Sequence, residues 1–109
     1  MIFTVRELRQ ATADKRQVFA WLHERSPSGA LSWLAAYDAM IERLKTGAAT
    51  FGEAYEQVDL EMSVKQALFK TRRGRVYRAL FLVEKNDVYI LRVRGPGQAP
   101  VTPTDLGQT

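Results

Sequence analysis

One stretch sets the fold of this 109-residue chain: Lys70-Thr71-Arg72-Arg73-Gly74-Arg75-Val76-Tyr77-Arg78-Ala79-Leu80-Phe81-Leu82-Val83. Its first nine residues include five cations and no acid, and its last five are all apolar. A short apolar run after a glycine-containing turn is typical of a buried β-strand. The strand therefore begins where positive charge is densest. A rigid sheet would hold these guanidinium groups in a fixed geometry, in which they can meet phosphates or carboxylates.

Two similar runs flank this strand in the sequence. Residues 64–71, 76–85 and 88–94 are all rich in β-branched and aromatic residues, which favour strands. They are separated by residues 72–75 and by Asn86-Asp87, which are good turn sequences. Links this short predict a three-stranded antiparallel meander, with the doubly apolar middle run as a central strand.

The first half of the chain has a helical period instead. Residues 2–6 predict a short N-terminal strand, and Thr12 is expected to cap a helix that runs to Arg25. Pro27 opens a second helix, and Gly47 is its expected C-cap. An apolar stripe at spacings of four and three residues marks the second helix, at Ala30, Leu34, Tyr37, Ile41 and Leu44. The helices are expected to form an antiparallel hairpin, with Trp21, Trp33 and Tyr37 in its core.

The fold class that follows is α+β. The expected order is an N-terminal strand, the helical hairpin and the meander, with both helices packed on one face of the sheet. The other face would be left open. Strict alternation places Arg78 on the same side of its strand as Leu80, and Arg92 and Arg94 on the same side as Ile90. We expect a single domain over residues 1–95 and an irregular Pro/Gly-rich tail over 96–109.

Composition removes several classes of function. The chain has no cysteine and one histidine, His23, so disulfides, thiolate chemistry and histidine-based metal sites are not expected. We expect no cofactor and no metal. No apolar run has the roughly 20 residues that a membrane span needs. Absence of cysteine and of a signal-peptide pattern favours a cytoplasmic location with no membrane partner.

Charge is distributed unevenly along the chain. Residues 62–94 contain nine Lys or Arg and two acids, which gives 9 − 2 = +7, although the whole chain carries only +4. Residues 52–61 contain four acids and no base. The asymmetry favours an anionic partner for the C-terminal half. A solvated basic face that has no partner is an equally good interpretation of charge alone.

The sequence resembles the RelE/ParE family of toxins from bacterial type II toxin–antitoxin modules, which includes proteins described as plasmid stabilisation proteins. The resemblance covers residues 2–95. Its matching pieces are the N-terminal Phe3-Thr4-Val5 strand, the hairpin from Ala30 to Leu44, and the two blocks Val76–Val83 and Val88–Arg94. It implies a small toxin that a cognate antitoxin binds and neutralises in a hetero-oligomeric complex.

The family implies two kinds of target. RelE-like members are ribosome-dependent mRNA endoribonucleases, and ParE-like members inhibit growth by acting on DNA gyrase. By resemblance, Arg78 takes the place of the arginine that contacts the scissile phosphate, and Lys70 is a second candidate catalytic cation if the chain is RelE-like. RelE-like sites usually carry a titratable residue or a basic cluster just past the last strand. This chain has Gly95-Pro96-Gly97-Gln98 there, which favours the ParE-like, non-nuclease interpretation.

The remaining cations form a candidate surface for a nucleic acid or another target. They are Arg72, Arg73, Arg75, Arg92 and Arg94. Each has a plain structural alternative. Turn arginines often serve only solubility, and Arg78 could simply pair with a carboxylate of residues 52–61 or with the antitoxin. A third possibility is a non-toxic module of the same fold that binds a partner peptide.

Overall fold

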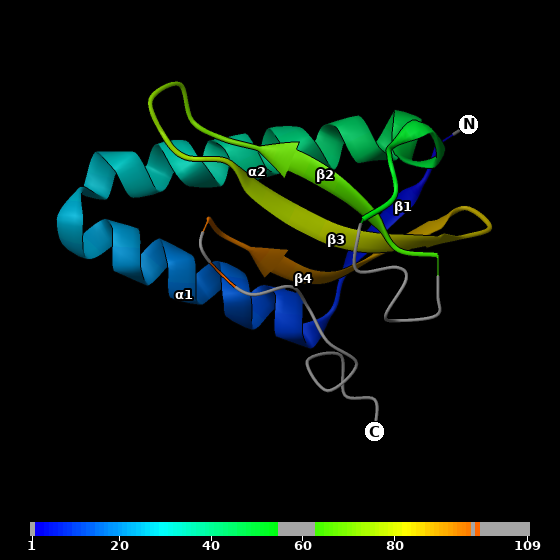
Figure 1. Ribbon diagram of the computed structural model, residues 1–109, viewed down its shortest axis with the longest axis horizontal. Coiled ribbons are helices and arrows are strands. Elements are labelled where there is room, and N and C mark those ends of the chain that lie inside the picture. The colour runs from blue at the N-terminus through cyan, green and yellow to red at the C-terminus, as the bar shows by residue number, and fades with distance from the viewer. Residues whose placement is uncertain (1, 55–62, 97, 99–109) are drawn as a thin grey trace.

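The computed structural model describes residues 2–54, 63–96 and 98. A four-stranded sheet carries a helical hairpin on one of its faces (Figure 1). The elements in chain order are β1 (Thr4–Glu7), α1 (Arg9–Arg25), α2 (Pro27–Gly47), a 3-10 turn η1 (Ala48–Thr50), β2 (Lys65–Phe69), β3 (Tyr77–Glu84) and β4 (Asp87–Arg94). The predicted α+β class and element order are confirmed.

The strand order in the sheet is β1-β4-β3-β2. The last three strands form the expected antiparallel meander, and β1 adds to β4 in parallel. Placing β1 beside β4 makes both β3 and β4 internal strands. The long connection through both helices allows this parallel pairing, because parallel neighbours need a crossover rather than a tight turn.

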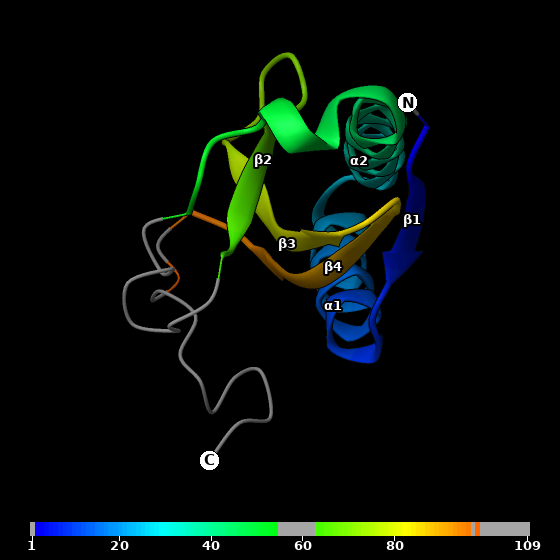
Figure 2. The ribbon, with the colours of Figure 1, turned by 90° about the vertical axis from the view of Figure 1, so that its right-hand side faces the viewer.

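The main core lies between the helices and the sheet. Met40 and Leu44 of α2 are fully buried, as are Phe81 of β3 and Ile90 of β4. Figure 2 shows both helices on the same side of the sheet. An aromatic group joins the two layers, because Trp33 of α2 lies 5.6 Å from the Phe69 ring of β2. This packing holds the sheet rigidly, so the direction of each strand side chain is fixed.

Several local expectations are wrong. Helix α1 begins at Arg9 with Leu8 as its N-cap, and Thr12 lies inside the helix, where its hydroxyl donates to Glu7 at 2.5 Å. Helix α2 ends one residue later than expected, with Ala48 as its C-cap. Trp21 is 52% exposed rather than part of the core. Ser26 does cap α2, since its Oγ accepts from the Gly29 N–H at 3.0 Å.

The face of the sheet without helices is not bare. A second, smaller cluster on it buries Ala54, Val64, Leu80 and Leu91. Residues 52–54 reach this cluster by pairing with the outer edge of β2, through Ala54 N–H to Val64 O at 2.8 Å and Gln66 N–H to Gly52 O at 3.0 Å. The expectation of an open second face is therefore only partly right. We call this side of the sheet the helix-free face.

Some predictions fall outside the described residues. Most of the acidic segment 52–61 and most of the proposed tail 96–109 lie there, so the domain boundary at residue 95 stays a prediction. Within the part of the chain that is described, no helix is long and apolar enough to cross a membrane.

Candidate anion-binding site on the sheet

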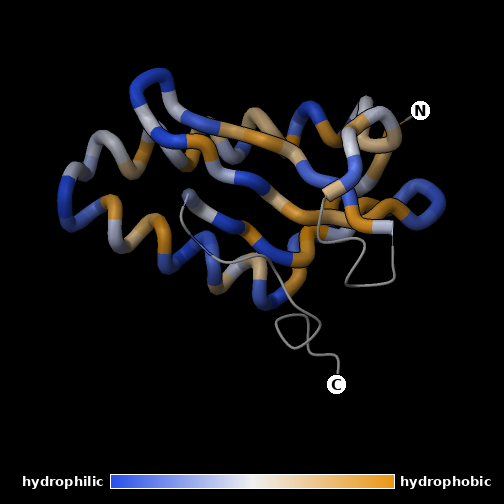
Figure 3. The backbone as a smooth tube through the Cα atoms, viewed as in Figure 1, coloured by the Kyte–Doolittle hydropathy of each residue, from blue (hydrophilic) through white to orange (hydrophobic). Residues whose placement is uncertain are grey.

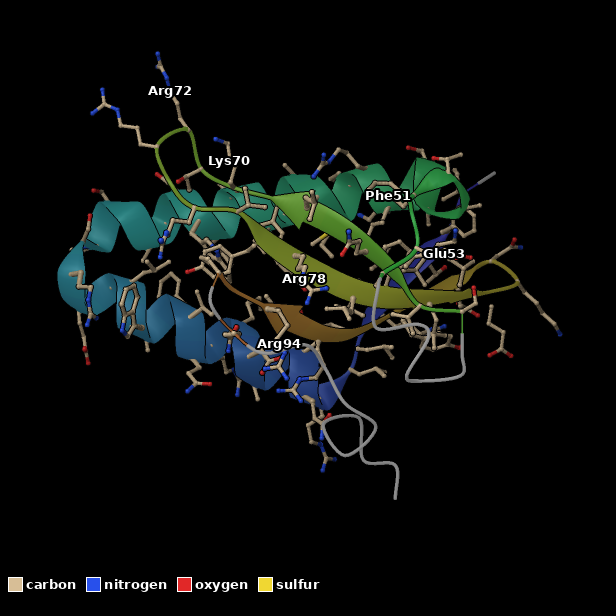
Figure 4. All side chains as sticks on the ribbon, viewed as in Figure 1. Phe51, Glu53, Lys70, Arg72, Arg78 and Arg94 are labelled. Atoms are coloured by element: carbon tan, nitrogen blue, oxygen red, sulfur yellow. The ribbon has the colours of Figure 1, made fainter. Side chains whose placement is uncertain are left out.

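Two arginines face each other across adjacent strands on the helix-free face. Arg78 of β3 and Arg94 of β4 are direct partners in the antiparallel register. Tyr77 and Ala79 flank Arg78 in β3 and pack in the main core under the helices. Because side chains alternate along a strand, Arg78 points to the helix-free face. Figure 4 shows both arginine side chains on the sheet. Their cross-strand pairing concentrates positive charge at one place.

Polar and apolar side chains of β2 and β3 lie beside Arg78. Arg78 Nη1 donates to Gln66 Oε1 of β2 at 3.3 Å. Leu68 is the cross-strand partner of Arg78 on β2 and is 51% exposed, while Leu80 is buried. The Arg78 guanidinium is thus set on a rigid sheet beside an amide and an exposed leucine. Such an arrangement can bind a carboxylate or a phosphate in a fixed geometry.

An irregularity in the β3–β4 ladder places Arg94 on this face. The register shifts between Leu80 and Phe81, because Leu80 pairs with Arg92 and Phe81 pairs with Ile90. Leu91 is the extra residue, which changes the side on which later residues of β4 lie. Ile90 and Val93 therefore share the helix-side core. The predicted placement of Arg92 and Arg94 on the side of Ile90 is wrong.

Arg92 has a structural role, because it pairs with an acidic residue of α1. Its Nε and Nη2 donate to the two carboxylate oxygens of Asp14 in α1 at 2.7 and 2.9 Å, and the Val93 N–H also donates to Asp14 at 3.0 Å. Both side chains are nearly buried, at 14% and 13% exposed. This bidentate pair ties α1 to the end of β4. Asp14 was not singled out by sequence reasoning, and no local pattern indicates a partner 78 residues away.

The turn between β2 and β3 carries the next three arginines. Arg72, Arg73 and Arg75 are all exposed, and Figure 4 shows Arg72 pointing away from the molecule and from Arg78. Figure 3 shows the same turn as a hydrophilic tip between hydrophobic strands. The turn is tight, because a Cβ on Gly74 would lie 2.2 Å from Thr71 Oγ1. The structure therefore separates the turn arginines from the Arg78–Arg94 pair.

Lys70 follows the end of β2 and is exposed. Leu68, not Lys70, is the residue opposite Arg78 in the ladder. A catalytic partnership of Arg78 with Lys70 stays a prediction. Gln66 was also missed by sequence reasoning, although its position two residues before Leu68 on an alternating strand puts it on the same side of the sheet.

Metal chemistry finds no support among the described residues. Within them no group of three or more histidines or acidic residues is placed to hold a metal ion. His23 lies near the end of α1 beside Phe19, with ring centroids 5.8 Å apart. What the described part of the site offers is therefore positive charge and hydrogen-bond donors.

Comparison with known proteins gives support at the level of structure. No family model matches the sequence, and no curated protein matches it. The fold is that of a chain in a solved structure described as "Chromosomal ParDE TA system from P. aeruginosa". The two superpose with a TM-score of 0.66 and 19% identity over 86% of this chain and 96% of the other. At this identity the likeness shows the fold alone, which is the fold expected from the RelE/ParE resemblance.

Proposed function

We propose that the protein is the toxin of a type II toxin–antitoxin module and that it acts in the ParE-like way, by binding its target. The observation that carries this proposal is the cross-strand pair of Arg78 and Arg94 on the helix-free face. Two guanidinium groups on adjacent strands can clamp a carboxylate or a phosphate of a macromolecule. The fold shared with a chain of a ParDE structure supports the same class.

Binding explains the site better than RNA cleavage does. Cleavage by a 2′-hydroxyl group needs a base near that hydroxyl and an acid near the leaving oxygen. Gln66, which accepts from Arg78, and Leu68, the partner of Arg78 on β2, are neither acids nor bases at neutral pH. Arginine itself stays protonated in proteins and supplies only electrostatic stabilisation. We therefore propose binding to a gyrase-type target as the mechanism and keep mRNA cleavage as the alternative.

The partner that neutralises such a toxin would be an acidic antitoxin segment. The arginine pair supplies the positive charge that such a segment would meet. In this proposal the antitoxin and the target compete for Arg78 and Arg94, and the complex is a hetero-oligomer in which the site is covered.

The test is inducible expression in bacteria, with colony-forming units as the readout. Wild type should arrest growth, and co-expression of an acidic protein encoded beside it should restore growth. Arg78→Gln should relieve the arrest, whereas Arg73→Gln, which changes the same charge in the exposed turn, should keep it. Growth of the wild-type strain with abundant folded protein would refute the toxin proposal.

The target is identified in the same strains. A ParE-like toxin should raise covalent gyrase–DNA adducts and cause filamentation. Transcript ends mapped on ribosomes should show no codon-phased cuts. Codon-phased cuts without gyrase adducts would replace the binding mechanism with the nuclease one and leave the toxin class standing.

A further inference from the structure

A pocket lies at the end of the hairpin where α1 and α2 are joined. It is a cavity of about 590 Å³ between the facing ends of α1 and α2, the β2–β3 turn and the end of β4. We call it the hairpin pocket, and its main walls are Val18, Trp21, Leu22, Trp33, Arg75 and Tyr77. Tyr77 belongs to the helix-side core, so the pocket lies on the opposite side of β3 from Arg78. Its volume is typical of sites for small molecules, which span roughly 300–1,000 Å³.

The walls favour a flat, apolar ligand. Trp33 and Tyr77 meet edge to face with centroids 5.5 Å apart. Trp21 is half exposed, and the Arg25 guanidinium carbon lies 3.7 Å from the centroid of its indole ring. Gly95 borders the same space, and a Cβ there would lie 2.8 Å from the Tyr77 ring. Aromatic side chains around a cavity bind planar rings by stacking and by edge contacts.

The polar groups of the pocket favour an anion. Arg25 and Arg75 both line it. Asp14 also lines it, but its two carboxylate oxygens already accept from Arg92. Arg75 forms no ion pair with any described residue. The positive charge of Arg75 also reaches Tyr77. Burial raises the pKa of Tyr77, and the Arg75 charge partly offsets that rise.

A buried donor in the wall has no acceptor in the part of the chain that the structure describes. Trp33 is 2% exposed, and its indole Nε1 has no hydrogen-bond partner among the described residues. Buried N–H groups are nearly always paired, because an unpaired one costs roughly 1–3 kcal/mol. Because Trp33 lines the pocket, a bound ligand with an acceptor that reaches this N–H would supply the missing partner.

We propose that the hairpin pocket binds a small aromatic carboxylate. Its ring would lie against Trp33 and Tyr77, and its carboxylate would meet Arg75 and accept from the Trp33 indole. This inference is independent of the proposed function, because it uses neither Arg78 nor Arg94. It adds a small-molecule ligand to the macromolecular partners proposed above.

The test uses 2-naphthoate as the probe and the two indole N–H signals of the ¹⁵N-labelled full chain. The chain has two tryptophans, so Trp21→Phe assigns both signals. Saturable binding with a downfield shift of the Trp33 signal is the expected result. Arg75→Gln should weaken binding about tenfold, as loss of one charged hydrogen bond does. Arg73→Gln, in the same turn but outside the pocket, should change affinity less than about twofold.

Trp33→Phe keeps the ring and removes the N–H, and it should also weaken binding. If that variant does not fold, the exposed Arg75→Gln variant still decides the question. Equal affinity for the neutral isostere 2-naphthalenemethanol would overturn the anion assignment. A Trp33 signal that does not move at saturation would overturn the site. An acidic ten-residue peptide with a central tryptophan that binds more than about tenfold tighter than 2-naphthoate would assign the pocket to a protein partner and overturn the proposal.

Discussion

Two polar regions of this molecule differ in the charges that they bring together. Under the helices, the Glu7 carboxylate accepts from Thr12 and Tyr37 at 2.5 Å each and from Lys15 at 2.9 Å. On the helix-free face, Arg78 and Arg94 are direct cross-strand neighbours of like charge. The first region joins an anion to its donors within the fold. The second brings two cations together on one face of the sheet, where they concentrate positive charge.

The difference indicates which region serves stability and which serves binding. In the Glu7 network, β1 supplies the acceptor, and α1 and α2 supply the donors, so the network joins three elements. Lys15 also lies 5.0 Å from the centroid of the Tyr37 ring. Burial and the hydrogen bond to Glu7 raise the pKa of Tyr37 well above its usual value of 10.0, so Tyr37 stays a donor. A closed network of this kind fixes the packing of the hairpin.

The largest effect is expected on the binding side. The double variant Arg78→Gln/Arg94→Gln should raise the Kd for purified gyrase by about 100-fold or more, because two charged hydrogen bonds are worth about 3–6 kcal/mol together. Its free energy of unfolding should fall by less than about 2 kcal/mol, because both residues are only partly buried and the hydrogen bond from Arg78 to Gln66 is changed. Isothermal titration calorimetry and urea denaturation measure the two quantities. A variant that loses several kcal/mol of stability and keeps its affinity would reverse the roles that we give the two regions.

The next effect is expected on the stability side. Glu7→Gln keeps the shape of the side chain and removes its charge, and it should lower the free energy of unfolding by about 2 kcal/mol, because hydrogen bonds to a charged group are each worth about 1.5–3 kcal/mol. Glu42→Gln is the matched control. Glu42 forms only a surface ion pair with Lys45, and its side chain is 69% exposed, so that change should cost less than about 0.5 kcal/mol.

Urea denaturation of the two variants measures this difference. Growth inhibition by Glu7→Gln should remain at temperatures at which the variant is folded, since Glu7 does not lie on the helix-free face. A folded Glu7→Gln protein without activity would show that the two regions are coupled.

The sequence predicted the covered side of the sheet better than the helix-free side. Trp33 and Tyr37 are buried as expected, because helical spacing places them toward the sheet. Trp21 has the same spacing but lies beyond the main core, where its ring meets Arg25 and the hairpin pocket. Periodicity reports which face of a helix is apolar, but it does not report how far along the helix a partner extends.

The candidate site was predicted in part. Arg78 and Leu80 share a face, as alternation requires. Alternation failed for Arg94 because Leu91 is an extra residue in the ladder, and neither a glycine nor a proline marks the irregularity in the sequence. The Asp14–Arg92 pair and the Glu7 network were also missed. Each depends on side chains from separate elements that come together only when the whole domain is folded.

The smallest expected effect is the pH dependence of the Glu7 network. Burial by itself would raise the pKa of Glu7, but the hydrogen bonds from Thr12, Tyr37 and Lys15 and the charge of Lys15 together lower it below its usual value of 4.5. The folded state therefore binds a proton at Glu7 less readily than the unfolded state does. The contribution of Glu7 to stability is complete above the unfolded pKa and is lost as the pH falls through the folded pKa.

The difference in unfolding free energy between wild type and Glu7→Gln should consequently be constant from pH 7 down to about pH 5.5 and should shrink below about pH 4.5. Other carboxylates titrate in both proteins, so the difference isolates Glu7. Urea denaturation at half-unit steps from pH 7 to pH 3 measures it. A difference that grows on acidification would mean that the pKa of Glu7 is raised in the folded state, and the three donors would then not be what keeps the Glu7 carboxylate charged.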